Sequence, residues 1–124
     1  GYLALCASTT GHYNTAVGAR ALEKNTTASN NTAVGYYTML SNSTGSENTA
    51  VGGNSLDANT TASNQTAVGY NALGATTTGA QNVAVGSQAM ANNTTGNTNV
   101  AVQDIINTAQ IKRMEEQRYK NIYV

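Results

Sequence analysis

The chain has 124 residues and no net charge at neutral pH, and Ala, Thr, Asn and Gly fill 67 of its positions. Charged residues make up 10%, against about 25% in an ordinary globular domain. No Lys/Arg cluster is present to neutralise phosphates, so nucleic-acid binding is not expected. No apolar run approaches the roughly 20 residues of a membrane helix, so membrane insertion is not expected either. The length allows one domain at most.

A short segment returns along the chain at a constant interval and without an insertion. It begins at Asn14, Asn31, Asn48, Gln65, Asn82 and Asn99, reading NTAVG three times, then QTAVG, NVAVG and NVAVQ. Three columns follow from this 17-residue period: Val17, Val34, Val51, Val68, Val85 and Val102; Ala16, Ala33, Ala50, Ala67, Ala84 and Ala101; and the large apolar residues Leu22, Met39, Leu56, Leu73 and Met90. A fixed period without slips indicates units that stack in register.

The length of the repeat predicts the fold class. The unit is too short for a helical-hairpin repeat, which needs about 33 residues or more, but it suits one coil of two short strands and two turns. The chain contains no Asn-Gly pair, the strongest hairpin signal, which favours parallel coils over antiparallel hairpins. We therefore expect an all-β parallel β-solenoid (a β-roll or β-helix) with about six 17-residue coils over residues 1–102.

Alternation along a strand assigns the columns to faces. We predict that the Val column points inward against the Leu/Met column, and that the Ala column points outward into an interface between chains. A tight bend that requires small residues is the alternative for the Ala column. One Val and one Leu per coil bury too little surface to offset the entropy of ordering the whole repeat. The array is therefore expected to be oligomeric, with Asn columns forming hydrogen-bonded ladders, one of them interrupted at Thr76.

Residues 103–124 have a different composition. They carry seven of the twelve charged residues, and residues 104–120 are rich in helix formers. Asp104 and Asn107 fall on the heptad seam, which argues against a long coiled coil. We predict a short C-terminal helix that caps the solenoid or connects it to an adjoining domain. Gly1 occupies the fifth position of a repeat, so the chain is expected to be part of a longer one or a processed product.

Residues with catalytic chemistry are few. His12 and Cys6 are the single residues of their types, and a metal or nucleophilic site needs partners that they lack. Cys6 is expected to be an inert thiol or to form a bridge between chains. Glu23 and Asp57 share a column two coils apart, but no cleft is implied. We expect neither an enzyme nor a cofactor or metal.

Tyr residues are the candidates for surface recognition. Tyr2, Tyr36 and Tyr70 follow the repeat Gly in every other coil, and could form a stacking platform on one face. Packing of the rings within the turns is the alternative.

The unit NTAVGYYTMLSNSTGSE, from Asn31 to Glu47, resembles the 17-residue repeat of phage tail fibres and related virion fibres. It is also similar, with a different period, to the head repeats of trimeric autotransporter adhesins. The resemblance covers residues 1–102. It implies a structural segment of a homotrimeric fibre that serves host attachment, located on a virion or outside the cell. The implied partners are two further copies of the chain, adjoining fibre domains, and a host-surface glycan or protein. A bacterial surface adhesin or extracellular filament subunit and an ice-binding solenoid are the alternatives.

Overall fold

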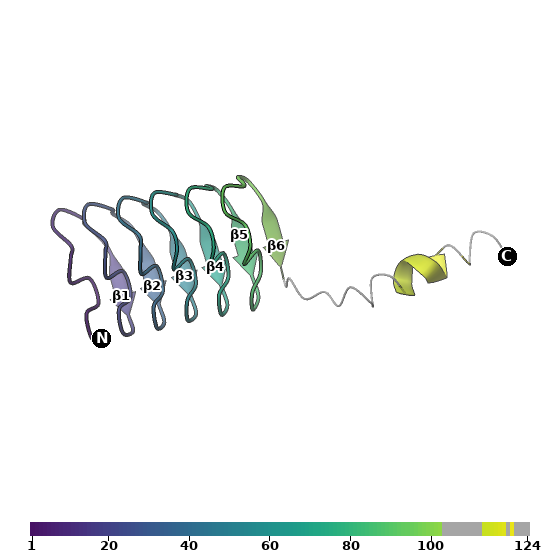
Figure 1. The fold of residues 1–124 in the computed structure, drawn as a ribbon, viewed down its shortest axis with the longest axis horizontal. Coiled ribbons are helices and arrows are strands. Elements are labelled where there is room, and N and C mark those ends of the chain that lie inside the picture. Colours follow the sequence, from purple (N-terminus) through teal and green to yellow (C-terminus); the bar gives the residue numbers. More distant parts are fainter. Residues whose placement is uncertain (103–112, 119, 121–124) are drawn as a thin grey trace.

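The computed structural model describes residues 1–102, 113–118 and 120. Residues 1–102 form a stack of coils in which one side of each coil is a three-residue strand (Figure 1). The strands are β1 (Thr15–Val17), β2 (Thr32–Val34), β3 (Thr49–Val51), β4 (Thr66–Val68), β5 (Val83–Val85) and β6 (Val100–Val102).

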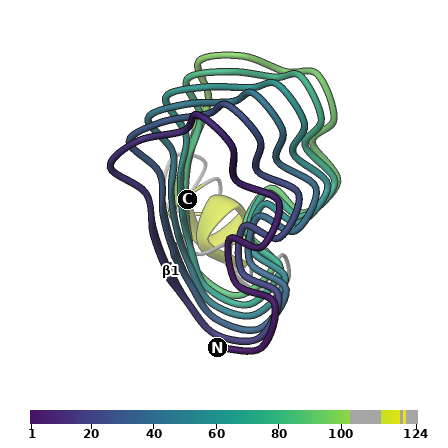
Figure 2. The ribbon, with the colours of Figure 1, turned by 90° about the vertical axis from the view of Figure 1, so that its left-hand side faces the viewer.

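The six strands form one parallel sheet in sequence order. Every strand residue pairs with its equivalent in the next repeat, as Ala33 does with Ala50. Seen along the stack, the successive coils repeat the same outline (Figure 2). The predicted parallel β-solenoid with 17-residue coils is therefore confirmed, but each coil has one strand and not the two expected, because the Thr-Thr segment forms a bend.

Each coil leaves its strand through overlapping tight turns. Ala21 N–H donates to the Gly18 carbonyl and Glu23 N–H to the Arg20 carbonyl, both at 3.3 Å. The third residues of these turns, Arg20 and Leu22, have φ angles of 60° and 51°, as type II turns require. Left-handed backbone is unusual for a large side chain. It recurs along the solenoid in the three columns that begin at Leu3, Leu5 and Tyr13.

The glycine that follows each of the strands β1 to β5 is required for close stacking. Gly35 has a φ of 140°, a conformation that strains any other residue. A Cβ atom on Gly35 would lie 2.6 Å from the Thr38 hydroxyl oxygen and 2.7 Å from the carbonyl carbon of Gly52 in the next coil. The repeat Gly therefore sets both the turn and the distance between coils.

The interior is thin and contains one large apolar residue per coil, small Ala residues and buried Asn side chains. Leu22, Met39, Leu56 and Leu73 are fully buried, while Leu5 and Met90 are partly buried against them. The Leu and Met residues therefore lie inside the solenoid, where the sequence analysis places them. They pack against the buried Ala residues of the strands and of the turns, such as Ala21 and Ala72.

The first Asn column forms a ladder between side chain and backbone. Asn31 Oδ1 accepts the backbone N–H of Asn48 at 2.9 Å, and Asn48 Nδ2 donates to the carbonyl of Ala62 at 2.9 Å. Gln65 continues the same pattern, since its Oε1 accepts the N–H of Asn82 at 3.1 Å. The predicted ladder exists, but its hydrogen bonds link side-chain amides to backbone groups. Each amide oxygen accepts from the backbone of the next coil, and each amide nitrogen donates to a turn carbonyl.

The second Asn column is a ladder between side chains. Asn42 Nδ2 donates to Asn25 Oδ1 at 3.2 Å, and Asn59 Nδ2 donates to Asn42 Oδ1 at 2.7 Å. Thr76 occupies the next position and sends its hydroxyl to the carbonyl of Asn93 at 2.9 Å instead. The Oδ1 of Asn59 is therefore buried without a hydrogen-bond partner.

The C-terminal segment is helical at residues 113–118 and 120, and all of these residues are exposed. Most of the segment predicted to cap or extend the solenoid, including Asp104 and Asn107, lies outside the described residues. The capping role remains a prediction.

Candidate functional site

The outward positions of the six strands form a face that the sequence analysis assigned to the interior. The prediction for the two strand columns is wrong: the Ala column points inward and the Val column outward. Ala33, Ala50, Ala67 and Ala84 are fully buried, with Ala16 and Ala101 partly exposed at the ends. Val17, Val51, Val68 and Val102 are exposed, with Val34 and Val85 partly exposed.

The thin interior explains the inversion. The inner side of the sheet directly contacts the Leu/Met column in a single apolar cluster. Buried Asn side chains such as Asn31 and Asn48 fill the adjoining space. A methyl group fits between these layers, whereas a Val side chain would overpack them. The constant Ala column therefore reflects the width of the interior and not an approach by a second chain.

The Thr/Val face comprises the outward positions 15, 17, 32, 34, 49, 51, 66, 68, 83, 85, 100 and 102. It contains Thr and Val and no charged residue. Val17 is 56% exposed, Val51 37% and Val68 36%. β-Branched residues in register across six parallel strands give an even surface. Its apolar side chains are left in contact with solvent in the single chain.

The Tyr strip, Tyr2, Tyr36 and Tyr70, lies beyond the Gly turn from the Thr/Val face. The side chains are 75%, 59% and 57% exposed. Ala19 and Gly53 occupy the same column in the intervening coils. A Cβ atom on Gly53 would touch Tyr70 Cδ2 at 3.7 Å. The Tyr70 ring therefore leans over the preceding coil, where the absence of a side chain leaves room for it.

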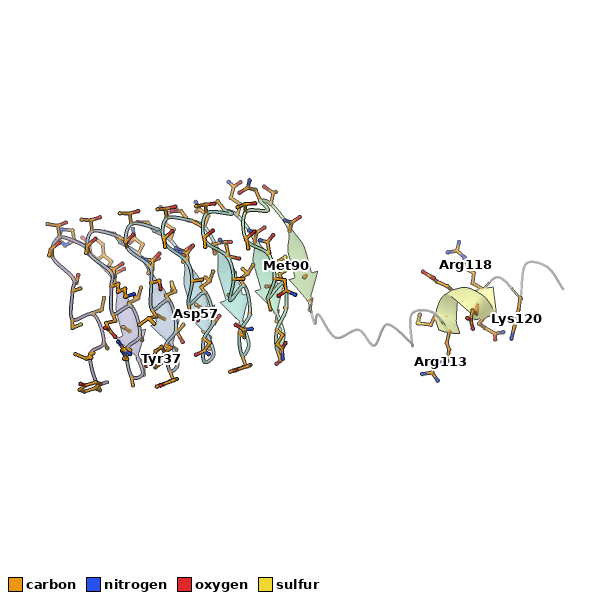
Figure 3. All side chains as sticks on the ribbon, in the orientation of Figure 1. Tyr37, Asp57, Met90, Arg113, Arg118 and Lys120 are labelled. Atoms are coloured by element: carbon orange, nitrogen blue, oxygen red, sulfur yellow. The ribbon has the colours of Figure 1, made fainter. Side chains whose placement is uncertain are left out.

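A polar cluster adjoins the Tyr strip. Arg20 forms an ion pair with Glu23 and donates from Nη1 to the Tyr37 hydroxyl at 2.7 Å. The Arg20 guanidinium lies 4.9 Å from the Tyr37 ring centroid, and the Tyr36 and Tyr37 ring centroids are 4.1 Å apart. Tyr37 lies at the lower edge of the coils in Figure 3. Arg20 therefore neutralises Glu23 and orients Tyr37, which contacts the Tyr strip through Tyr36.

The hydrogen bonds of this cluster shift its pKa values. The bond from Arg20 lowers the pKa of the Glu23 carboxyl and raises the pKa of Arg20 itself. The pKa of Tyr37 is lowered, first by the hydrogen bond with Tyr36 and then by that with Arg20, while the pKa of Tyr36 is raised. The cluster is thus an ion pair with hydrogen-bonded phenols around it.

The other titratable residues are dispersed. His12 is exposed, and its backbone N–H donates to Ser29 Oγ at 3.0 Å. Cys6 is a free, exposed thiol. Burial raises the pKa of Asp57, with its backbone hydrogen bonds acting in the opposite direction. In the described ranges, no three His, Cys, Asp or Glu side chains are grouped closely enough to hold a metal ion. No described helix is long and apolar enough to cross a membrane.

Sequence reasoning missed the Arg20 cluster and the outward Val face. The cluster had a signal in the period itself, because Arg20 and Tyr37 are one repeat apart and so stack in one column. Glu23 follows Arg20 at the i+3 position, which brings the two side chains together across one turn. The orientation of the strand had no such signal, since alternation predicts two opposite faces but not which of them is inside.

The fold places the chain in the class of parallel β-solenoid repeat proteins, with a three-residue strand in each 17-residue coil. Comparison of the chain with protein-family models, curated proteins and solved structures finds no match.

Proposed function

We propose that residues 1–102 form a structural segment of a homotrimeric fibre that serves host attachment, and that the Thr/Val face is the interface between its chains. The observation that carries the proposal is the exposure of Val on an uncharged sheet face, exemplified by Val17 at 56% and Val102 at 63%. Covering a Val side chain gains up to about 1.5 kcal/mol. A face that repeats this gain in each coil favours association along its whole length.

The inward Ala column strengthens the case for association. With Ala in place of Val, each coil buries one large apolar side chain, such as Leu56, and several small ones. The single-chain core is therefore thinner than one that buries both a Val and a Leu in each coil. Coil-to-coil hydrogen bonds and the Asn ladders satisfy the polar groups inside, but they offset the conformational entropy only partly. Burial of the Thr/Val face supplies further stabilisation.

The shape suits a spacer within a fibre. Six coils at the spacing of parallel strands extend for about 30 Å. The resemblance of the repeat to those of phage tail fibres supports three chains and a location on a virion, with adjoining fibre domains at the ends. A bacterial surface adhesin or extracellular filament is the alternative with the same architecture.

The oligomeric state tests the proposal. Light scattering is expected to give three times the chain mass of 12.8 kDa. Val51→Lys/Val68→Lys places two charges on the Thr/Val face and is expected to dissociate the trimer. Thr44→Lys/Thr61→Lys places the same charges at exposed positions away from the strands and should leave it intact. A folded wild-type monomer, or a double Val variant that remains trimeric, would contradict the proposed interface.

Location is tested separately by immuno-electron microscopy with antibodies against this chain. Labelling of fibres on virus particles supports the virion proposal. Labelling of a bacterial surface in the absence of virus supports the adhesin instead.

A second candidate is binding to an ice surface, and one structural observation favours it. Adjacent Thr residues, such as Thr26 and Thr27, do not suit an ice-binding array, because neighbouring side chains on an extended segment point to opposite faces. In the strands, however, Thr32 and Val34 point outward with the inward Ala33 between them, which gives the regular two-column array that ice binding needs. Thermal hysteresis of the purified protein would support this function, and its absence at millimolar concentration would exclude it.

A further inference from the structure

We propose that the Tyr strip binds an uncharged, extended β-1,4-linked glycan, with the three rings contacting consecutive disaccharide units of one polymer chain. This proposal rests on the proposed role in attachment and names a ligand class for it. All three residues of the strip belong to one chain. It assigns a ligand class to Tyr2, Tyr36 and Tyr70, which the stability of the solenoid does not explain.

The spacing of the rings is the first argument. Tyr2, Tyr36 and Tyr70 recur in every second repeat, so the backbone positions that carry neighbouring rings are two coils apart. Two coils span about 9.6 Å along the solenoid axis, at the separation of neighbouring parallel strands. A β-1,4-linked hexose chain is an extended ribbon in which the same ring face returns once per disaccharide, at nearly this distance. An α-1,4-linked chain curves and does not keep such a register.

The intervening coils keep the rings accessible. Ala19 and Gly53 separate the three Tyr residues in the same column, so no large side chain of that column stands between them, while Tyr37 packs against Tyr36 from the next column. The Tyr70 ring leans over Gly53, with Cδ2 at 3.7 Å from the position of a Cβ atom there. A ring in this position exposes an extended aromatic surface, on which the apolar C–H groups of a sugar pack.

The polar surroundings suit a neutral ligand. Arg20 is paired with Glu23, so the cationic group nearest to Tyr36 and Tyr37 carries its own counter-charge and offers no unpaired charge to an acidic polymer. The column next to the strip contains the partly exposed residues Asn54 and Asn71. Their amides, together with the Tyr hydroxyls, provide donors and acceptors for sugar hydroxyl groups.

Isothermal titration calorimetry with hexasaccharides tests the proposal. The full chain is titrated with β-1,4-linked glucose and β-1,4-linked N-acetylglucosamine hexamers, and with an α-1,4-linked glucose hexamer as the control. Binding of at least one β-linked hexamer, with little or no binding of the α-linked one, is expected. Tyr70→Ala should reduce the association constant by about threefold to tenfold, the effect of one aromatic contact.

Two control variants separate the spacing of the rings from their number. Tyr13→Ala removes a ring that is 86% exposed but lies in another column, and should leave binding unchanged. Tyr70→Ser/Ser87→Tyr keeps three rings but moves the last one by one coil, and should weaken binding as Tyr70→Ala does. Circular dichroism establishes that each variant is folded.

Binding that is absent for every hexamer, equal for α and β linkages, or insensitive to the position of the third ring would overturn the proposal. Light scattering on the same samples keeps this result separate from the fibre proposal. A trimer that does not bind glycan refutes the role of the Tyr strip alone, whereas a monomer that binds glycan refutes the trimer alone.

Discussion

The gap in the second Asn ladder predicts that Thr76→Asn stabilises the solenoid. Asn59 Oδ1 is a buried acceptor without a partner because Thr76 occupies the position from which Asn42 and Asn59 donate in the preceding coils. The carbonyl of Ala62 accepts from two amides, those of Asn48 and Asn59. An amide introduced at position 76 would restore both the ladder bond and the turn bond in the next coil.

The magnitude follows from the bonds gained and lost. Satisfying a buried acceptor recovers about 1–3 kcal/mol. The substitution removes the bond from the Thr76 hydroxyl to the Asn93 carbonyl, which is worth about 1 kcal/mol. Gln65, one methylene longer than the Asn of the other coils, already donates to the Gly79 carbonyl and limits the room for a second amide. We expect a net gain of about 1 kcal/mol, which raises the Tm by about 4 °C.

Urea unfolding followed by circular dichroism measures this gain in a double-mutant cycle. Thr76→Asn, Gln65→Asn and the double variant are compared at equal protein concentration, and Thr78→Asn at an exposed position is the control. The double variant should be the most stable, since it reproduces the arrangement of the preceding coil, and the two sites should couple. A loss of stability on Thr76→Asn in both backgrounds would refute the ladder argument.

Three further predictions concern the core, the turns and pH. Ala50→Val, at a fully buried position, should cost about 1–3 kcal/mol by overpacking, whereas a neutral effect in urea unfolding would contradict the inward orientation. Gly35→Ala should lower the free energy of unfolding by about 1–3 kcal/mol, while Gly53→Ala, which meets no atom closer than 3.7 Å, should be nearly neutral; equal effects would refute the close-stacking argument. Arg20 lowers the pKa of Glu23 from the ordinary value of 4.5, so this contribution to stability is present above that pH and is lost as the pH falls. Thermal unfolding from pH 7 to pH 3 should therefore show a smaller loss for Glu23→Gln than for the wild type, and identical profiles would contradict the pairing.

The period and register were predictable because they depend on side chains that repeat. The recurrence of NTAVG and its close variants every 17 residues aligns each strand with the next, and the structure pairs equivalent residues of successive repeats in every case, from Thr15 with Thr32 onward. The break in the Asn ladder at Thr76 was also visible, because one missing amide in a column needs no knowledge of the coil outline. The trimer and the attachment role remain proposals.

Alternation and hydrophobicity did not predict which of the two strand columns, Ala or Val, is buried. Val is more apolar than Ala, so a rule based on burial alone places Val51 inside and Ala50 outside. That rule assumes an interior with room for both columns. The backbone turns at Leu22 and its equivalents, with φ near 50°, bring the large apolar column directly against the sheet and leave space for a methyl group.

The constant 17-residue spacing was enough to predict the solenoid, its coils and the stacking columns, because the register between repeats depends only on where equivalent residues recur. Only the fold shows that the Ala column and not the Val column faces the interior, because this depends on the width of the interior, which the turns set. The left-handed residues of these turns differ in type, from Leu3 and Arg20 to Asn71 and Gln88. No single residue type in the sequence therefore predicts them. The outward Thr/Val face, on which the proposed interface rests, follows from that width.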